Sequence, residues 1–130
     1  MPVTCQYENN KQGVIITAVG TVDGEEFIRN MKELFSNEQT IRNYRYGLND
    51  FTQLEKFNIS LPQISTLADP HIDVSRINPN IIVGFAISKP FIHGLVNIWK
   101  VYAGITGWQV NITKTLPETR DWIDIKSAQS

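Results

Sequence analysis

The pattern of apolar and polar positions is most informative between residues 81 and 104. Its first part, Ile81 to Ile87, is an almost unbroken run of β-branched and aromatic residues. A strand without alternation is typical of a sheet that is covered on both faces. The second part begins at Pro90, which suits the first turn of a helix, and repeats apolar residues at helical spacing. We therefore predict an interior parallel strand followed directly by a helix over 90–104, which is half of a β-α-β unit.

Before this unit, the chain opens with a predicted β-hairpin. Val3, Cys5 and Tyr7 alternate with polar residues, which is the pattern of a half-buried strand. A polar run over 8–13 then leads into a second apolar stretch at 14–19. We predict that the first of these strands is an antiparallel edge strand.

The hairpin is followed by a predicted helix and a third strand. Asp23 begins a capping-box pattern, so a helix is expected to start there and to end in a polar loop at Asn37. Tyr44 to Phe51 has the composition of the next strand, with Asp50 at its carboxyl end. Gly47 within this strand indicates close packing against a neighbouring element.

Ser60 begins a second capping box, of the form S-x-x-Q, and with it a short helix over 61–68. Pro70 is expected to stop this helix, because a proline in the interior lacks the N–H that the helix needs. We interpret 71–80 as an ordered loop or a single irregular helical turn.

The chain ends with a strand and a helix. Trp108 to Thr113 alternates cleanly, which predicts a strand near the edge of the sheet. Thr115 begins a last helix that is expected to bury Trp122 and Ile123. The remaining residues, 127–130, have the composition of a frayed tail.

The predicted order of elements is β-β-α-β-α-β-α-β-α. This order is that of an α/β fold with a single mixed five-stranded sheet flanked by helices. At 130 residues the chain is long enough for one substantial core and too short for two, so we predict one domain over 1–126.

Composition narrows the classes of function. A formal net charge of -1 and a pI near 6.1 give no electrostatic reason to expect nucleic acid or an anionic membrane as partner. The N-terminus lacks the pattern of a signal peptide, and no apolar stretch approaches the ~20 residues of a membrane span. The single cysteine, Cys5, suits a reducing compartment. We therefore expect a cytoplasmic protein without membrane insertion.

Several of these features occur together in one known family. They are the opening hairpin, the strand that ends in Asp50, and a run of elements from residue 82 to 123. That run contains a buried strand, a helix with Gly94-Leu95 and an aromatic residue at Trp99 or Tyr102, a further strand, and a final helix from Glu118 to Trp122-Ile123. In this order and with this packing, the chain resembles the STAS or SpoIIAA-like superfamily, specifically its small stand-alone bacterial domains.

The resemblance implies a non-enzymatic regulatory module that acts through an unknown protein partner. In the anti-sigma factor antagonists of this family, a partner kinase phosphorylates a serine at the start of the helix after the third strand. Ser60 occupies the matching position and is therefore a candidate phosphosite. The antagonists have an Asp-Ser-x-Gly type sequence at this point, whereas this chain reads Asn58-Ile59-Ser60-Leu61-Pro62. The alternative is that Ser60 is a plain N-cap.

Polar residues follow the predicted parallel strands at their carboxyl ends, which is where open α/β sheets bind ligands. Asp50, Ser60, Ser88 and Lys89 form this candidate ligand or partner edge. Asp50 and Lys89 are not needed as caps if Ser88 caps the following helix. The alternative is that these two residues are only solvent-exposed side chains at the edge of the sheet. An enzyme centre around them is the least favoured interpretation.

The predicted helix over 90–104 has more apolar surface than one sheet can cover, about 220° of its circumference. The surplus lies at Val96 and Ala103 on one flank and at Val101 on the other, and together with Trp99 these residues form the candidate apolar interface or pocket. We expect a homodimer partner to cover it. A small apolar or lipid-like ligand beneath the helix is the alternative, which the lipid-binding Sec14-type folds of the same broad superfamily make conceivable. Packing against the chain's own preceding loop would also use this surface.

No catalytic site is predicted. His71 and His93 are the only histidines, and no nucleophile is spaced with a base and an orienting acid. Asp69 and Asp73 alternate with His71, but such a pattern beside a proline is far more often a polar loop than a metal site. We therefore expect no enzyme, no cofactor and no metal.

Overall fold

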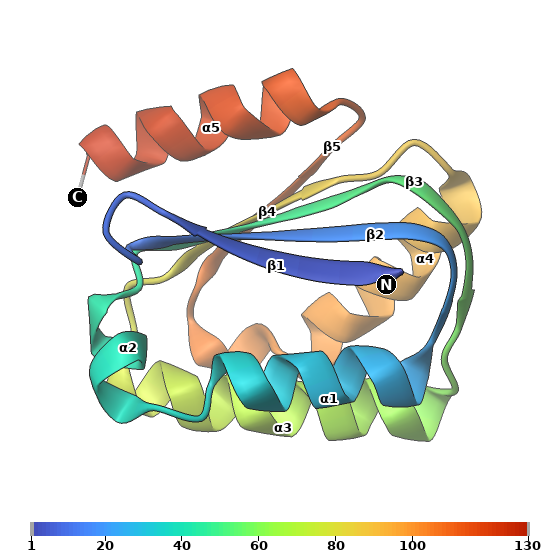
Figure 1. Cartoon of the computed structure of the whole chain (residues 1–130), viewed down its shortest axis with the longest axis horizontal. Coiled ribbons are helices and arrows are strands. Elements are labelled where there is room, and N and C mark those ends of the chain that lie inside the picture. Colours follow the sequence, from blue (N-terminus) through green and yellow to red (C-terminus); the bar gives the residue numbers. More distant parts are fainter. Residues whose placement is uncertain (1, 130) are drawn as a thin grey trace.

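Five strands form one mixed sheet in the order β1-β2-β3-β4-β5. The computed structural model describes residues 2–129 (Figure 1). Its elements are β1 (Val3–Glu8), β2 (Gly13–Asp23), α1 (Gly24–Leu34), α2 (Glu38–Asn43), β3 (Tyr46–Asn58), α3 (Leu61–Ile77), β4 (Ile82–Ala86), α4 (Pro90–Tyr102), the 3-10 turn η1 (Gly104–Thr106), β5 (Gln109–Thr113) and α5 (Leu116–Ala128). Strand β1 pairs antiparallel with β2, and the other neighbours are parallel. The predicted α/β fold with a mixed five-stranded sheet is confirmed.

The helices cover the two faces of the sheet unequally. Each crossover from β2 to β5 advances by one strand in the same direction, so right-handed connections place α1, α3 and α4 on one face. Helix α5 follows the last strand and returns across the opposite face (Figure 1). Strand β4 lies between β3 and β5 with all five residues buried, as predicted for an interior strand.

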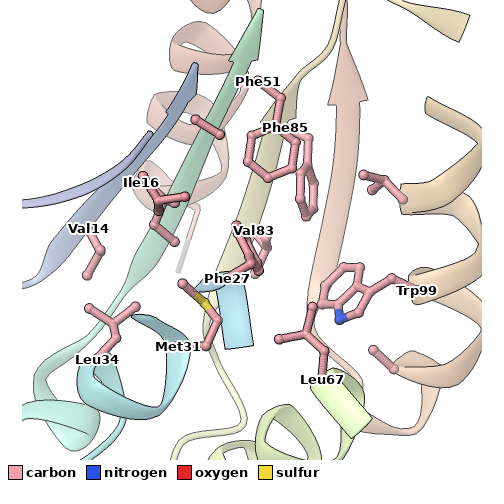
Figure 2. Packing of buried hydrophobic residues seen from close by; sticks show 14 of the residues in the cluster. Val14, Ile16, Phe27, Met31, Leu34, Phe51, Leu67, Val83, Phe85 and Trp99 are labelled. Atoms are coloured by element: carbon pink, nitrogen blue, oxygen red, sulfur yellow. The ribbon is translucent and has the colours of Figure 1, made fainter. Parts of the chain in front are cut away.

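The main core fills the space between the sheet and helices α1, α3 and α4 (Figure 2). At its centre the ring of Phe51 lies edge-on to Phe27 and Phe85, with centroids 5.9 and 5.7 Å away. A smaller cluster lies under α5. It consists of Tyr46, Leu48, Ile82 and Ile123, with Ile15 and Trp122 packed against it. The sheet is thus buried on both faces near β3 and β4.

Helix α3 continues through Pro70 to Ile77, so the predicted stop at Pro70 and the predicted loop over 71–80 are wrong. Proline in a helix interior removes a hydrogen bond and costs about 3 kcal/mol. Leu67 before it and Val74 after it are both buried in the main core. Burial on both sides of the proline offsets the lost hydrogen bond and keeps the helix continuous.

Two other boundaries and one predicted cap differ from the sequence-based expectation. The polar loop after Asn37 contains helix α2, because the Asn37 side chain accepts a hydrogen bond from Thr40 N (3.1 Å) and Ile41 is buried. Asp23 precedes α1 but makes no side-chain cap hydrogen bond. Helix α5 extends to Ala128, into the segment expected to be a frayed tail, and residue 130 lies outside the described residues.

Candidate functional site

Asp50 is not at the carboxyl end of its strand, so that prediction is wrong. It pairs with Ala86, the last residue of β4, whereas β3 continues to Asn58 as a ribbon with β2 alone. At ~3.3 Å per residue, the eight residues beyond Asp50 place Ser60 on the order of 20 Å away. The structure therefore separates Ser60 from the other predicted edge residues.

Ser60 is the N-cap of α3. Its Oγ accepts a hydrogen bond from Gln63 N (3.2 Å), and Gln63 Oε1 accepts one from Ser60 N (2.9 Å). The capping box lies against the start of α1, where a Cβ on Gly24 would come within 2.6 Å of Gln63 Oε1. The interpretation of Ser60 as a cap is confirmed, and its phosphorylation stays a prediction.

Ser88 and Asp50 are linked through Thr52. Ser88 Oγ donates to the Thr52 carbonyl oxygen (3.1 Å), so it does not cap α4. Asp50 Oδ1 accepts from both Thr52 N (3.2 Å) and Thr52 Oγ1 (2.7 Å). Lys89 is the N-cap residue of α4 by position and makes no side-chain cap hydrogen bond. The edge therefore divides into an Asp50–Thr52–Ser88 contact and the separate Ser60 cap.

A shallow depression of about 250 Å³ lies beside Ser88 and Lys89. His93 and Lys114 also line it, and among the described residues no acidic side chain does. Lys89 lies at the start of α4 and Lys114 lies just before α5, so two positive charges and two helix N-termini favour negative charge nearby. The depression is therefore a basic surface feature at the carboxyl ends of β4 and β5.

The four predicted apolar residues of α4 divide between core and surface. Val96, Trp99 and Ala103 are buried in the main core, whereas Val101 is 81% exposed. Trp99 lies edge-on to Phe85 with ring centroids 5.4 Å apart. The flank with Val96 and Ala103 is thus covered by the protein itself, and only the flank with Val101 is left open.

A cavity of about 80 Å³ lies inside the main core, between the sheet and the three helices on that face. Its lining is almost entirely apolar and includes Val96. Met31, Leu67 and Trp99 also line it (Figure 2). A cavity of about 150 Å³ is known to admit benzene, so this one has about half of that volume. It has room for a very small apolar molecule, and a lipid chain would require the helices to move apart.

His71 lies in α3 and is buried among aromatic rings. Its ring faces those of Phe35, Trp99 and Trp108, with centroids 5.4, 5.2 and 5.9 Å away. Nδ1 lies 2.7 Å from the Leu67 carbonyl oxygen, so this nitrogen carries the proton and donates it. Burial lowers the pKa of His71 to about 4, and the ring is therefore neutral at pH 7.

The alternation of Asp69 and Asp73 with His71 does not produce a ligand cluster. Both carboxylates are exposed, whereas the imidazole is buried in the core. Residues two apart on a helix point in widely different directions. Within residues 2–129, no group of three His, Cys, Asp or Glu side chains is arranged to hold a metal ion.

A polar cluster that the sequence did not reveal joins the first hairpin to α5. The Glu8 carboxylate accepts hydrogen bonds from the Tyr46 hydroxyl and the Arg120 guanidinium, whose second nitrogen lies 3.4 Å from the other oxygen. The bond from Arg120 is the main cause that lowers the pKa of Glu8, and burial raises the pKa of Tyr46 to about 12. Glu8 and Arg120 are 112 residues apart, so no local pattern could have indicated this contact.

Replacing Arg120 by alanine is expected to lower the free energy of unfolding by about 1 kcal/mol and to raise the pKa of Glu8. The pair is only partly exposed, with side chains at 36% and 27%, so it loses less to solvent screening than a surface pair. Urea denaturation at low and high salt would measure the stability, and an NMR titration the pKa. Arg42→Ala is the control, since Arg42 lies 3.6 Å from Glu38 in an exposed pair. Equal effects of the two variants would contradict this role for Arg120.

Comparison with known proteins places the fold. No family model matches the chain, and no curated protein matches it in sequence. Among solved structures, the anti-sigma factor antagonist SpoIIAA in its unphosphorylated form superposes with a TM-score of 0.60, over 94% of this chain and 97% of that one, at 10% identity. The fold is SpoIIAA-like.

A second structure has the same SpoIIAA-like fold. It is an uncharacterized protein of the DUF3478 family from Shewanella loihica PV-4, with a TM-score of 0.50, 10% identity, and coverage of 93% of this chain and 91% of that one. The fold expected from the resemblance to the STAS and SpoIIAA-like superfamily is thus confirmed. At this identity the likeness shows the fold alone. Within residues 2–129, no helix is long and apolar enough to cross a membrane.

Proposed function

We propose that this protein is a non-enzymatic regulatory module that acts in the cytoplasm through protein-protein contacts, as a homodimer. Its SpoIIAA-like fold supports the regulatory part of the proposal, because the similar structure of SpoIIAA is that of an anti-sigma factor antagonist. This proposal assigns it no cofactor and no catalytic residue. The partner protein is defined only by the surfaces that it would contact.

The single observation that carries the proposal is the exposed apolar surface of α4 and the turn after it. Phe91, Val101 and Ile105 are 69%, 81% and 77% exposed, and Tyr102 is 44% exposed. Soluble monomers seldom leave large apolar side chains together in water, because their burial against a partner is favourable. This surface is therefore the strongest indication of a protein contact.

Two polar features would serve the regulatory role. Ser60 is exposed at the N-terminus of α3, where the positive end of the helix dipole favours a phosphate group. We propose it as the phosphosite through which a kinase would change partner binding. Ser88 and Lys89, exposed near Asp50, would form the rim of the partner surface.

The cavity beneath α4 favours a second candidate function, the binding of a small apolar or lipid-like ligand. Its walls offer few polar groups, which suits an apolar molecule. Its volume of about 80 Å³ restricts the ligand to a very small one unless α4 moves outward. This candidate is therefore less favoured than the protein-interaction module.

Native mass spectrometry of freshly purified protein would separate the two candidates. We expect twice the mass of the chain without an adduct. A monomer that carries a small-molecule adduct would favour the ligand candidate instead. A monomer without an adduct at all protein concentrations would contradict both, and a spectrum under denaturing conditions would control for covalent species.

A further inference from the structure

Helix α4 has a second apolar side that faces solvent. Its core side consists of Ile92, Val96, Trp99 and Ala103, all buried. On the other side six apolar residues recur at helical spacing, and we name them the α4 stripe: Phe91, Leu95, Ile98, Val101, Tyr102 and Ile105. Leu95 and Ile98 are partly buried and the other four are exposed. The α4 stripe continues over the whole length of the helix and into η1.

Gly94 lies within the α4 stripe and has no role in the protein's own packing. A Cβ at this position would meet no atom of residues 2–129 within 4 Å. Glycine inside a helix costs about 1 kcal/mol relative to alanine. The fold therefore gives no reason for a glycine here, whereas a second element in close approach to the helix would.

The α4 stripe is symmetric in sequence about Ile98. Phe91 and Ile105 each lie seven positions from it, Leu95 and Val101 three positions, and Gly94 and Tyr102 four positions. If an antiparallel copy of the helix crosses at Ile98, the two residues at equal distance from Ile98 face each other across the interface between the copies. The large side chain of Tyr102 would then meet the gap at Gly94, and Ile98 would meet its own counterpart.

We propose that the α4 stripe is the interface of a two-fold symmetric homodimer, in which two antiparallel α4 helices cross at Ile98. In a two-fold interface, residue i of one copy contacts residue j of the other, and residue j of the first contacts residue i of the second. The pairs at equal distance from Ile98 meet this requirement. This inference rests on the proposed homodimer and adds to it the surface, the helix orientation and the register.

Charge and the helix dipole also favour a second copy as the occupant. The α4 stripe contains no charged residue, and a net charge of -1 per chain gives little repulsion between copies. In an antiparallel pair, the positive end of each helix dipole lies beside the negative end of the other.

Val101→Glu and Ile105→Glu test the surface. Both residues are largely exposed, so the variants are expected to fold with an unchanged thermal midpoint. The dimer dissociation constant, measured by sedimentation equilibrium, is expected to rise about 100-fold or more, because each copy would bury an unpaired carboxylate. The matched control is Ile125→Glu, which changes another exposed isoleucine (57%), on α5, and should leave the dimer intact.

Two further experiments test the orientation and the register. Phe91→Lys and Ile105→Glu chains are each expected to dimerise weakly, and their mixture is expected to recover a heterodimer through the new Lys–Glu pair. In a Cys5→Ser background, Ile98→Cys is expected to cross-link to its own copy when oxidised glutathione serves as the oxidant. Asn97→Cys, on the exposed polar flank, is the control and should not cross-link.

The outcomes separate this inference from the proposed function. A dimer that is insensitive to Val101→Glu and Ile105→Glu would overturn the α4 stripe as interface and leave the proposed homodimer standing. Failure of the mixed chains to associate would overturn the antiparallel register. A protein that stays monomeric at every concentration, or that instead binds anionic lipid vesicles through the same residues, would overturn both.

Discussion

Replacing Gly84 by valine is expected to lower the free energy of unfolding by about 3 kcal/mol and to loosen α5 from the sheet. A Cβ at Gly84 would lie 2.6 Å from Thr119 Cγ2 and 3.1 Å from Ile123 Cδ1. Both of those side chains are fully buried between α5 and the sheet. Neither has space to move aside, so the added atoms must displace the helix.

Gly47→Ala is the matched control for this substitution. Gly47 lies on β3 beside Val83, one position before the Leu48–Gly84 pair. A Cβ there would meet no atom of the described part of the chain within 4 Å, and the residue lines the core cavity. We expect this variant to be as stable as the wild type or more stable by up to about 1 kcal/mol, since alanine reduces the entropy of the unfolded chain.

Urea denaturation would compare the two variants, and hydrogen exchange would locate the effect. Amides of α5 are expected to exchange faster in Gly84→Val before those of β3 and β4 do. A Gly84→Val protein with wild-type stability would show that α5 does not pack closely on β4 at Gly84.

Acidification from pH 6.5 to 4 is expected to destabilise the protein by about 3 kcal/mol through His71 alone. In the unfolded chain this histidine takes up a proton near pH 6.5, whereas burial lowers its pKa in the folded state to about 4. Between these values the unfolded state binds the proton and the folded state does not, so acid favours unfolding. Well above pH 6.5, His71 is neutral in both states, so its contribution to the free energy of unfolding no longer changes with pH.

Denaturation curves recorded across this range would measure the effect of His71. His71→Asn keeps a donor for the Leu67 carbonyl without an ionisable ring, so its stability should change little between pH 6.5 and 4. His93→Gln, at an exposed position on α4, should retain the wild-type slope. In the folded state the pKa of Glu8 is lowered from 4.5, so the stability that its carboxylate contributes is lost only as the pH falls below 4.5. A wild-type profile that is flat between pH 6.5 and 4 would contradict the burial of a neutral His71.

Local patterns were sufficient for the order of elements and for several of their ends. The interior strand over 82–86, the helix from Pro90 and the Ser60 cap were predicted because periodicity, proline placement and capping act within a few residues. The SpoIIAA-like fold followed from that order. The candidate phosphosite at Ser60 stays a prediction, since the cap geometry is the same with or without a kinase.

The candidate site depended on contacts that local patterns do not contain. Helical periodicity showed that α4 has more apolar surface than the sheet needs, but it did not show which side faces the core. The structure buries Val96 and Ala103 and leaves Val101 in solvent. Asp50 was separated from Ser60 because β3 continues past the end of β4, and strand length is set by pairing with β2.

The sequence by itself determined the fold class, the strand-helix unit at its centre and the presence of surplus apolar surface on α4. Only the tertiary structure decided that α3 passes through Pro70, that close packing occurs at Gly84 rather than at Gly47, and that Glu8 meets Arg120. The first set depends on interactions within one or two helical turns or strand repeats. The second set depends on burial against segments that are distant in the chain. The free energy of that burial exceeds the local conformational preferences, and it leaves no pattern in the local sequence.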